Sequence, residues 1–289
     1  MQGMLKYLFL RGLSFGMPFV RSFPLGMRKQ LAVLTDRQNW IPNCHALSMS
    51  IIRDWAERDV DAFHRFLWAH HLGYAKFYEA VHDFGPGNLV LTRKMLFEDL
   101  RKYLGQQGNS LSCAGSIKSI FDVGCSAGYL LRFMETELFP GATTLEGNDI
   151  DEYALQMGEI YLRAKASKIR LVRADMADLD RIMNKRKFDL ILCAGVLMYL
   201  QESAAFGVVQ SMLNHCSGLV VITGLAHPVS DNAALVSSEP RKSDGGLIHN
   251  IDRMVQKAGG RVVYRRWEGA KDFEGQTVYF IFCRPAASC

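Results

Sequence analysis

"FDVGCSAGYL", residues 121–130, joins a hydrophobic run to an apolar, helix-like segment. Between them stand three small residues, Gly124, Ser126 and Gly128. Glycines at a strand-to-helix turn let the backbone approach a ligand closely, and the N-terminus of the following helix offers free N–H groups. The stretch therefore predicts a strand, a ligand-binding turn and a helix. Taken without its surroundings, it fits a merely flexible loop equally well.

Downstream of this turn, short hydrophobic segments alternate with helical patterns. The expected strands are residues 117–124, 142–149, 169–175, 188–195 and 218–224, with two closing strands at 261–269 and 277–285. The expected helices are residues 129–138, 151–166, 176–184, 201–216 and 249–260. This alternation predicts an α/β fold with a Rossmann-like, doubly wound, mostly parallel seven-stranded sheet.

The chain upstream of the turn has a different pattern. Residues 46–85 and 92–105 carry apolar and aromatic side chains at spacings of three and four, which predicts helices. Glycine and small polar residues then replace this pattern in "GQQGNSLSCAGS", residues 105–116. We therefore expect an N-terminal helical extension over residues 1–110, serving as a substrate lid or as a membrane or partner contact, and a ligand-binding domain over residues 111–289.

Acidic residues follow the second and third expected strands. Asp149 lies 21 residues beyond Gly128, where a carboxylate could accept hydrogen bonds from both hydroxyls of a ribose. Asp175 could accept from an exocyclic amine. Each acid alone is more often a helix cap or a solvated loop residue. Together with Asp122 they form a constellation suited to a nucleoside.

The glycine pattern narrows the choice of nucleotide. A dinucleotide fingerprint has glycine at its sixth place, where the helix packs on the strand, and that place is Tyr129 here. A GxxxxGK[ST] phosphate loop is absent from the sequence. An NAD-linked oxidoreductase is thus disfavoured but stays an alternative, as does a non-catalytic protein that keeps the pocket as a scaffold.

These segments resemble the motifs of class I S-adenosylmethionine-dependent methyltransferases. "FDVGCSAGYL" is similar to their first motif with Ser126 in place of the middle glycine, and "LEGNDIDEYAL", "RADMADL" and "FDLILCAGVLMYL" resemble the next three. The resemblance covers residues 117–225 and implies S-adenosylmethionine as cofactor. It implies contacts to the methionine portion from Asp122, Gly124, Cys125, Ser126 and Gly128, to the ribose from Asp149, to the adenine from Ile150, Asp175 and Met176, and to the sulfonium from Cys193 and Ala194.

The acceptor is less constrained by the sequence. "CAGVL" at the fourth strand differs from the [DN]PP[YF] of amino methyltransferases acting on nucleic-acid bases, and no strongly basic cluster predicts nucleic-acid binding. We expect a small-molecule acceptor, lipid-like or glycosylated, with a hydroxyl oxygen as the preferred atom. His227, after the fifth strand, is the first candidate for a general base. A residue that orders the turn before Pro228 is the alternative interpretation.

Composition sets broader limits. Hydrophobic residues make up 49% of the chain and charged residues 22%, which is typical of a globular protein. Seven scattered cysteines without a CxxC pair predict reduced thiols in the cytoplasm, and no metal site is expected. Residues 1–35 carry cations among apolar residues and no acid, so they could cover an anionic membrane surface peripherally or pack on the main domain.

Overall fold

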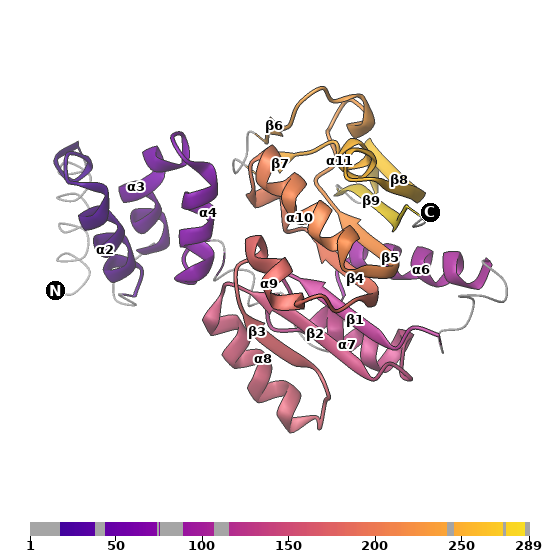
Figure 1. Cartoon of the computed structure of the whole chain (residues 1–289). Coiled ribbons are helices and arrows are strands. Elements are labelled where there is room, and N and C mark those ends of the chain that lie inside the picture. Colours follow the sequence, from indigo (N-terminus) through magenta and orange to yellow (C-terminus); the bar gives the residue numbers. More distant parts are fainter. Residues whose placement is uncertain are drawn as a thin grey trace. The chain divides into compact units, whose positions relative to one another are not determined.

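The computed structural model describes residues 18–37, 44–73, 75, 89–106, 116–241, 246–273 and 276–286 (Figure 1). The chain divides into two compact units, Met1–Val81 and His82–Cys289. Helix α6 (Leu91–Gln106), which we expected in the N-terminal extension, belongs to the second unit. The physical reason is its apolar face, because Leu96 and Leu100 are buried in the same hydrophobic cluster as the strands.

The described part of the first unit contains the helices α2 (Leu25–Asp36), α3 (Cys44–Ala56) and α4 (Val60–Ala69). Two of the cations that suggested contact with a membrane surface instead contact other residues of this unit. The Arg28 guanidinium is buried and bonds Asp54 at 2.5 Å, and the Lys29 ammonium lies 3.8 Å from the centroid of the Trp55 ring. Lys6 and Arg11 lie outside the described residues. These contacts favour packing of α2 on α3.

The second unit is built on a sheet that, among the described residues, has seven strands. In sheet order they are β3 (Arg170–Arg173), β2 (Thr144–Asp149), β1 (Ser119–Val123), β4 (Phe188–Ala194), β5 (Cys216–Thr223), β9 (Gln276–Pro285) and β8 (Gly260–Phe273). The first five are parallel, and β9 runs antiparallel to both of its neighbours. The predicted doubly wound, mostly parallel sheet is confirmed. Its strand order reverses between β1 and β4, where ligands of such sheets bind.

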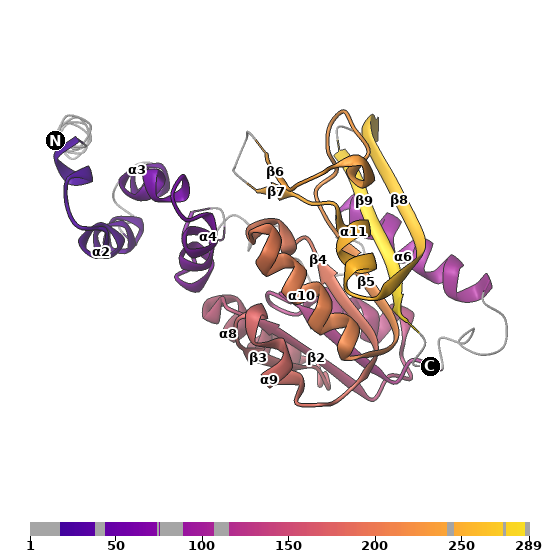
Figure 2. The same cartoon turned by 45° about the horizontal axis from the view of Figure 1, so that its top comes forward.

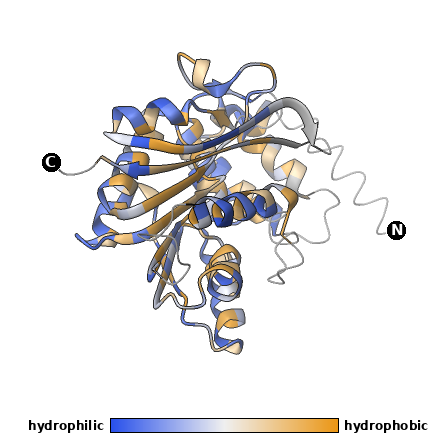
Figure 3. Ribbon diagram, turned by 90° about the vertical axis from the view of Figure 1, so that its right-hand side faces the viewer, coloured by the Kyte–Doolittle hydropathy of each residue, from blue (hydrophilic) through white to orange (hydrophobic). Residues whose placement is uncertain are grey.

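Helices cover both faces of this sheet (Figure 2). One face packs on α6, α7 (Tyr129–Phe133) and α8 (Glu152–Ala164), and the other on α9 (Leu179–Met183), α10 (Glu202–Asn214) and α11 (Ile251–Lys257). Successive strand residues point to opposite faces. In β1, Ile120 therefore joins the first cluster and Phe121 the second. The apolar strands lie between helices whose outer surfaces are hydrophilic (Figure 3).

The remaining elements are short. A π-helical turn, Met134–Leu138, continues α7, and 3₁₀ turns follow β3 (η3, Met176–Asp178), β4 (η4, Leu197–Tyr199) and β5 (η5, Asn232–Ala234). A separate small sheet pairs β6 (Glu239–Pro240) with β7 (Leu247–Ile248). Of the helices in the described ranges, none has the length and apolar character needed to span a bilayer.

Candidate functional site

The turn between β1 and α7 is held in a left-handed backbone conformation. Gly124, Ser126 and Gly128 have φ angles of 71°, 50° and 80°. The amides of Gly124 and Cys125 both donate to the carbonyl of Asn148 at 2.9 Å, which fixes the turn against the end of β2. A Cβ atom at Gly124 would lie 2.5 Å from Cγ2 of Val196. Glycine at position 124 is thus required both by its positive φ and by the packing of Val196. Ser126 adopts a positive φ although it carries a side chain.

Asp149 is fixed at the end of β2 by the backbone of this turn. Its Oδ2 accepts from the Ser126 amide at 2.7 Å, and its Oδ1 accepts from the Asp151 amide at 2.9 Å. Burial raises the pKa of Asp149 to about 6, although the hydrogen bonds from these amides act in the opposite direction. Each carboxylate oxygen can accept a further hydrogen bond, so the group can still receive hydroxyls.

Asp122, near the end of β1, is buried, and its Oδ2 has no hydrogen-bond partner among the described residues. Burial raises the pKa of Asp122 well above its usual range; the Asp149 charge raises it further, and the Arg93 guanidinium opposes the rise. A buried carboxylate oxygen without a partner is costly unless a ligand donates to it. The structure therefore brings Asp122 and Asp149 together beside the Gly124–Gly128 turn, in an arrangement suited to a cationic group.

Asp175 lies at the same edge but has a local role as well. The Ala174 amide donates to the Asp149 carbonyl at 2.9 Å, which places the ends of β2 and β3 side by side. The Asp175 carboxylate accepts from the Ala177 amide at 2.9 Å and caps the turn η3. Ile150 and Met176, which follow β2 and β3, are both partly exposed.

Two of the predicted contact residues turn their side chains away from the edge. Cys193 is fully buried in the cluster beneath α9 and α10, and burial raises the pKa of its thiol. The Cys125 thiol is also buried, and its side chain packs where a Cβ of Gly147 would stand. Only the backbone at these two positions can border a ligand, whereas Ala194 is partly exposed.

Arg93, from α6, is a component of this edge that the sequence did not reveal. Its Nη1 donates to Oγ1 of Thr223 at 2.9 Å, and its Nη2 donates to the carbonyl of Ala194 at 2.9 Å. The guanidinium is buried, and a Cβ at Gly195, whose φ is 76°, would lie 2.8 Å from Nη2. The sequence signal was weak, because Arg93 is one of several cations in an amphipathic helix, and such cations usually face solvent.

His227 follows β5 and serves its own loop. Its Nδ1 accepts from the amides of Val229 and Ser230, at 3.2 and 2.8 Å, and its Nε2 lies 3.5 Å from a carboxylate oxygen of Glu239. A neutral imidazole that accepts at Nδ1 carries its proton on Nε2. In this conformation neither ring nitrogen is available to take a proton from a substrate. The geometry favours the turn-ordering interpretation.

The neighbouring residues Asp231 and Asn232 are also engaged internally. Oδ1 of Asn232 accepts from the His227 amide and from Nε1 of Trp267, each at 2.8 Å. Its Nδ2 donates to the carbonyls of Leu225 and His249 at 2.9 and 2.8 Å. Oδ2 of Asp231 accepts from Nη1 of Arg265 at 3.0 Å.

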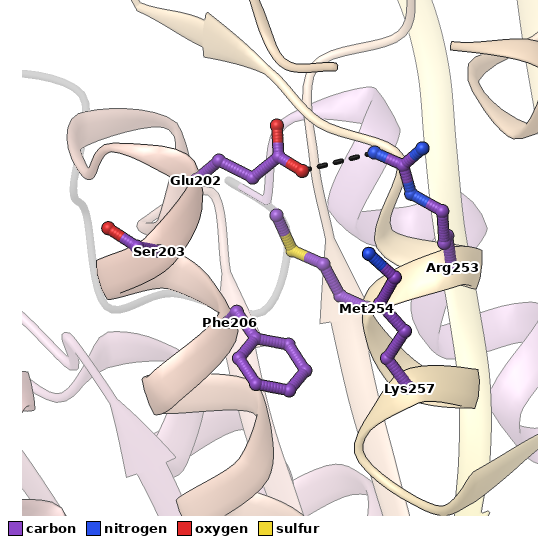
Figure 4. A pocket seen from close by; sticks show the side chains of 6 residues that line it. All are labelled: Glu202, Ser203, Phe206, Arg253, Met254 and Lys257. Atoms are coloured by element: carbon purple, nitrogen blue, oxygen red, sulfur yellow. Dashed lines mark hydrogen bonds and ion pairs between the residues drawn. The ribbon is translucent and has the colours of Figure 1, made fainter. Parts of the chain in front are cut away.

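A shallow groove of about 390 Å³ runs between α10 and α11 (Figure 4). It is lined by Glu202, Ser203, Phe206, Arg253, Met254 and Lys257. Its rim is bridged by an ion pair between Glu202 and Arg253 at 3.0 Å. The predicted site residues do not line this groove, so it is distinct from the edge built by β1, β2 and β4. Nor does the described part of the chain gather three or more potential metal ligands in one place.

Comparison with known proteins agrees with this geometry. Residues 120–217 match the family model of a methyltransferase domain. This match to a methyltransferase domain supports the resemblance to class I S-adenosylmethionine-dependent methyltransferases that the sequence motifs carry. No curated protein matches the chain in sequence.

Solved structures share the fold at low sequence identity. Magnesium protoporphyrin IX methyltransferase from Synechocystis PCC 6803, solved with bound S-adenosylmethionine, is similar with a TM-score of 0.52, 13% identity, and coverage of 79% of this chain and 98% of that one. An S-adenosylmethionine-dependent methyltransferase from Clostridium acetobutylicum ATCC 824 has a TM-score of 0.50, 12% identity, and coverage of 74% and 96%. A Pyrococcus horikoshii OT3 protein has a TM-score of 0.51, 12% identity, and coverage of 73% and 98%. At this identity the likeness concerns the fold.

Proposed function

We propose that the edge formed by β1, β2 and β4 binds S-adenosylmethionine and that the protein transfers its methyl group to a small-molecule acceptor. The observation that carries the proposal is the convergence of Asp122 and Asp149 on the Gly124–Gly128 turn, with a buried oxygen of Asp122 lacking a partner among the described residues. Asp122 receives the ammonium of the methionine portion, and Asp149 accepts from the ribose hydroxyls. Ile150 and Met176 flank the adenine, and Asp175 accepts from its amine.

The cofactor supplies a methyl group on a positively charged sulfur, which is the difficult part of the chemistry. The chain's own residues then have two tasks, to align the acceptor and to exclude water. Gly124 and Gly195, with φ angles of 71° and 76°, let the backbone turn sharply at the ends of β1 and β4, where Val196 and Arg93 pack against them. Two carboxylates at the edge also complement the cationic cofactor electrostatically.

A hydroxyl oxygen on a lipid-like or glycosylated small molecule is the acceptor that we favour. The segment at the end of β4, "CAGVL", lacks the [DN]PP[YF] pattern associated with amino acceptors on nucleic-acid bases. A hydroxyl needs a base, and His227 stays the sequence candidate although its ring is tied to its own loop. The cytoplasmic location stays a prediction. Peripheral membrane contact through residues 1–35 also stays a prediction, and pelleting of the protein with anionic liposomes tests this contact.

Calorimetric titration tests the cofactor directly. We expect S-adenosylmethionine and S-adenosylhomocysteine to bind and NAD to give no heat. Binding of NAD alone would instead support an oxidoreductase. Incubation with radiolabelled S-adenosylmethionine and a metabolite extract then separates an enzyme, which labels an extractable product, from a scaffold that binds the cofactor without turnover.

A further inference from the structure

The guanidinium of Arg93 stands where the strand order of the sheet reverses. It bonds the ends of β4 and β5 through the Ala194 carbonyl and the Thr223 hydroxyl, both at 2.9 Å, and its charge acts on Asp122 of β1. Three neighbouring strands therefore end around one buried cation. Because α6 precedes the recognised motifs in sequence, nothing in those motifs assigns this residue a role.

We propose that Arg93 is a positioning residue for the amino-acid end of the cofactor, acting through Asp122, whose charge it balances, and through the strand ends that it bridges. The inference rests on the proposed function. An ionised Asp122 is needed to hold an ammonium group, and a carboxylate in a buried position stays ionised only when a counter-charge is near. Arg93 is the cation that supplies this counter-charge, and α6 is the helix that delivers it.

The surroundings of Asp122 show why a counter-charge matters. The charged groups that act on the pKa of Asp122 are the Asp149 carboxyl from β2 and the Arg93 guanidinium from α6. Burial raises the pKa of the thiols of Cys125 in the turn and of Cys193, which points to the other face of the sheet, and the charge of Asp122 raises the pKa of both thiols further. Burial and the Asp149 charge both raise the pKa of Asp122, and Arg93 opposes them. Without Arg93, the protonated form of Asp122 would be favoured further, and a protonated carboxyl pairs poorly with an ammonium.

The packing indicates a built arrangement. Gly195 has a φ of 76°, and any side chain there would meet the guanidinium, since a Cβ would lie 2.8 Å from Nη2. The backbone after β4 is thus shaped around Arg93. The same backbone borders the expected position of the methyl group, so the placement of α6 is coupled to the site.

The test compares ligands that differ in the amino-acid end. S-adenosylhomocysteine carries this end, whereas 5′-deoxy-5′-methylthioadenosine lacks it. In Arg93→Met we expect the affinity for S-adenosylhomocysteine to fall roughly 10- to 100-fold, the range for loss of an interaction with a charged group, and the affinity for methylthioadenosine to stay within about twofold. The loss should shrink as the pH is raised, because Asp122 then ionises without help, and Arg93→Lys should recover part of the affinity.

Arg101→Met is the matched control, because Arg101 lies on the same helix and its guanidinium only reaches the Glu137 carbonyl at 3.4 Å in an exposed setting. If Arg93→Met does not fold, Thr223→Val removes one partner of the guanidinium while keeping the side-chain shape, and it should weaken S-adenosylhomocysteine more than methylthioadenosine. An equal loss of both ligands, or no loss of either, in a folded variant would overturn the inference. Failure of both ligands to bind the wild-type protein would instead overturn the proposed function.

Discussion

The ends of β1 and β5 lie at the same edge of the sheet, yet the polar groups near these two ends differ in how completely they are hydrogen-bonded. At β1, the buried Oδ2 of Asp122 has no hydrogen-bond partner among the described residues, and three residues of the following turn have positive φ angles. After β5, Asn232 bonds the His227 amide, Trp267 and two carbonyls, and His227 accepts from the amides of its own loop.

This difference distinguishes a strand end that binds a ligand from a loop whose polar groups only stabilise the fold. Buried polar groups are nearly always hydrogen-bonded, so an orphan carboxylate oxygen in a well-packed edge indicates a place where a ligand donates. A loop whose polar groups are mutually satisfied has no such need. We therefore expect substitutions near β1 and β2 to alter cofactor binding, and substitutions in the loop after β5 to alter mainly stability.

The largest effect should come from adding one methyl group at the turn. Gly124→Ala combines a positive φ of 71° with a Cβ only 2.5 Å from Val196. We expect the free energy of unfolding to fall by about 2–4 kcal/mol, from backbone strain and overpacking, and cofactor binding to be lost. The matched control is Gly207→Ala in α10, where a Cβ meets nothing within 4 Å. That variant should gain about 0.5–1 kcal/mol, and thermal or urea unfolding measures both.

A smaller effect should follow removal of the carboxylate on β2. Asp149→Ala should weaken S-adenosylmethionine binding by about 1–3 kcal/mol, because a charged hydrogen-bond acceptor is lost. Calorimetric titration measures this change, with Asp178→Ala as control, since Asp178 pairs with the exposed Arg181 on the surface. Unchanged affinity in Asp149→Ala would mean that the ribose lies elsewhere.

The pH dependence of binding sharpens the same point. The pKa of Asp149 is raised to about 6, so the carboxylate is ionised at pH 7.5 and becomes protonated as the pH falls through 6. If only the ionised form accepts the ribose hydroxyls, affinity should fall by about fourfold between pH 7.5 and 5.5. The component that titrates near pH 6 should disappear in Asp149→Asn. A profile unchanged by this substitution would contradict the assignment.

The sequence sufficed for the sheet because each strand is a short buried run next to a recognisable turn. The acids at the ends of β1 and β2 were also predictable, since a carboxylate after a buried strand and beside a glycine turn is a local pattern. Ser126 shows the limit of such patterns, because its φ of 50° follows the glycine motif although its residue type does not.

Long-range packing was not readable in the same way. Arg93 meets Ala194 and Thr223, which lie 101 and 130 positions away, and no local pattern signals that contact. The boundary expected at residue 110 followed a change in composition, whereas the compact unit begins at His82 and includes α6. For Cys193, position in the motif placed it at the site, but strand alternation turned its side chain into the core.

The smallest change in cofactor binding should come from His227. His227→Ala removes the acceptor for two amides whose residues, Val229 and Ser230, are exposed, so water can replace it. We expect a loss of about 0.5–1.5 kcal/mol in stability, S-adenosylmethionine affinity within about twofold of wild type, and methyl transfer to extract acceptors reduced less than tenfold. His215→Ala is the matched comparison. His215 directly precedes β5, at the end of the strand opposite to His227, and its Nδ1 bonds the Arg186 carbonyl. A general base contributes about 10²–10⁴-fold, so a loss of that size in folded His227→Ala, with cofactor affinity intact, would show that the loop rearranges to free the imidazole when the acceptor binds.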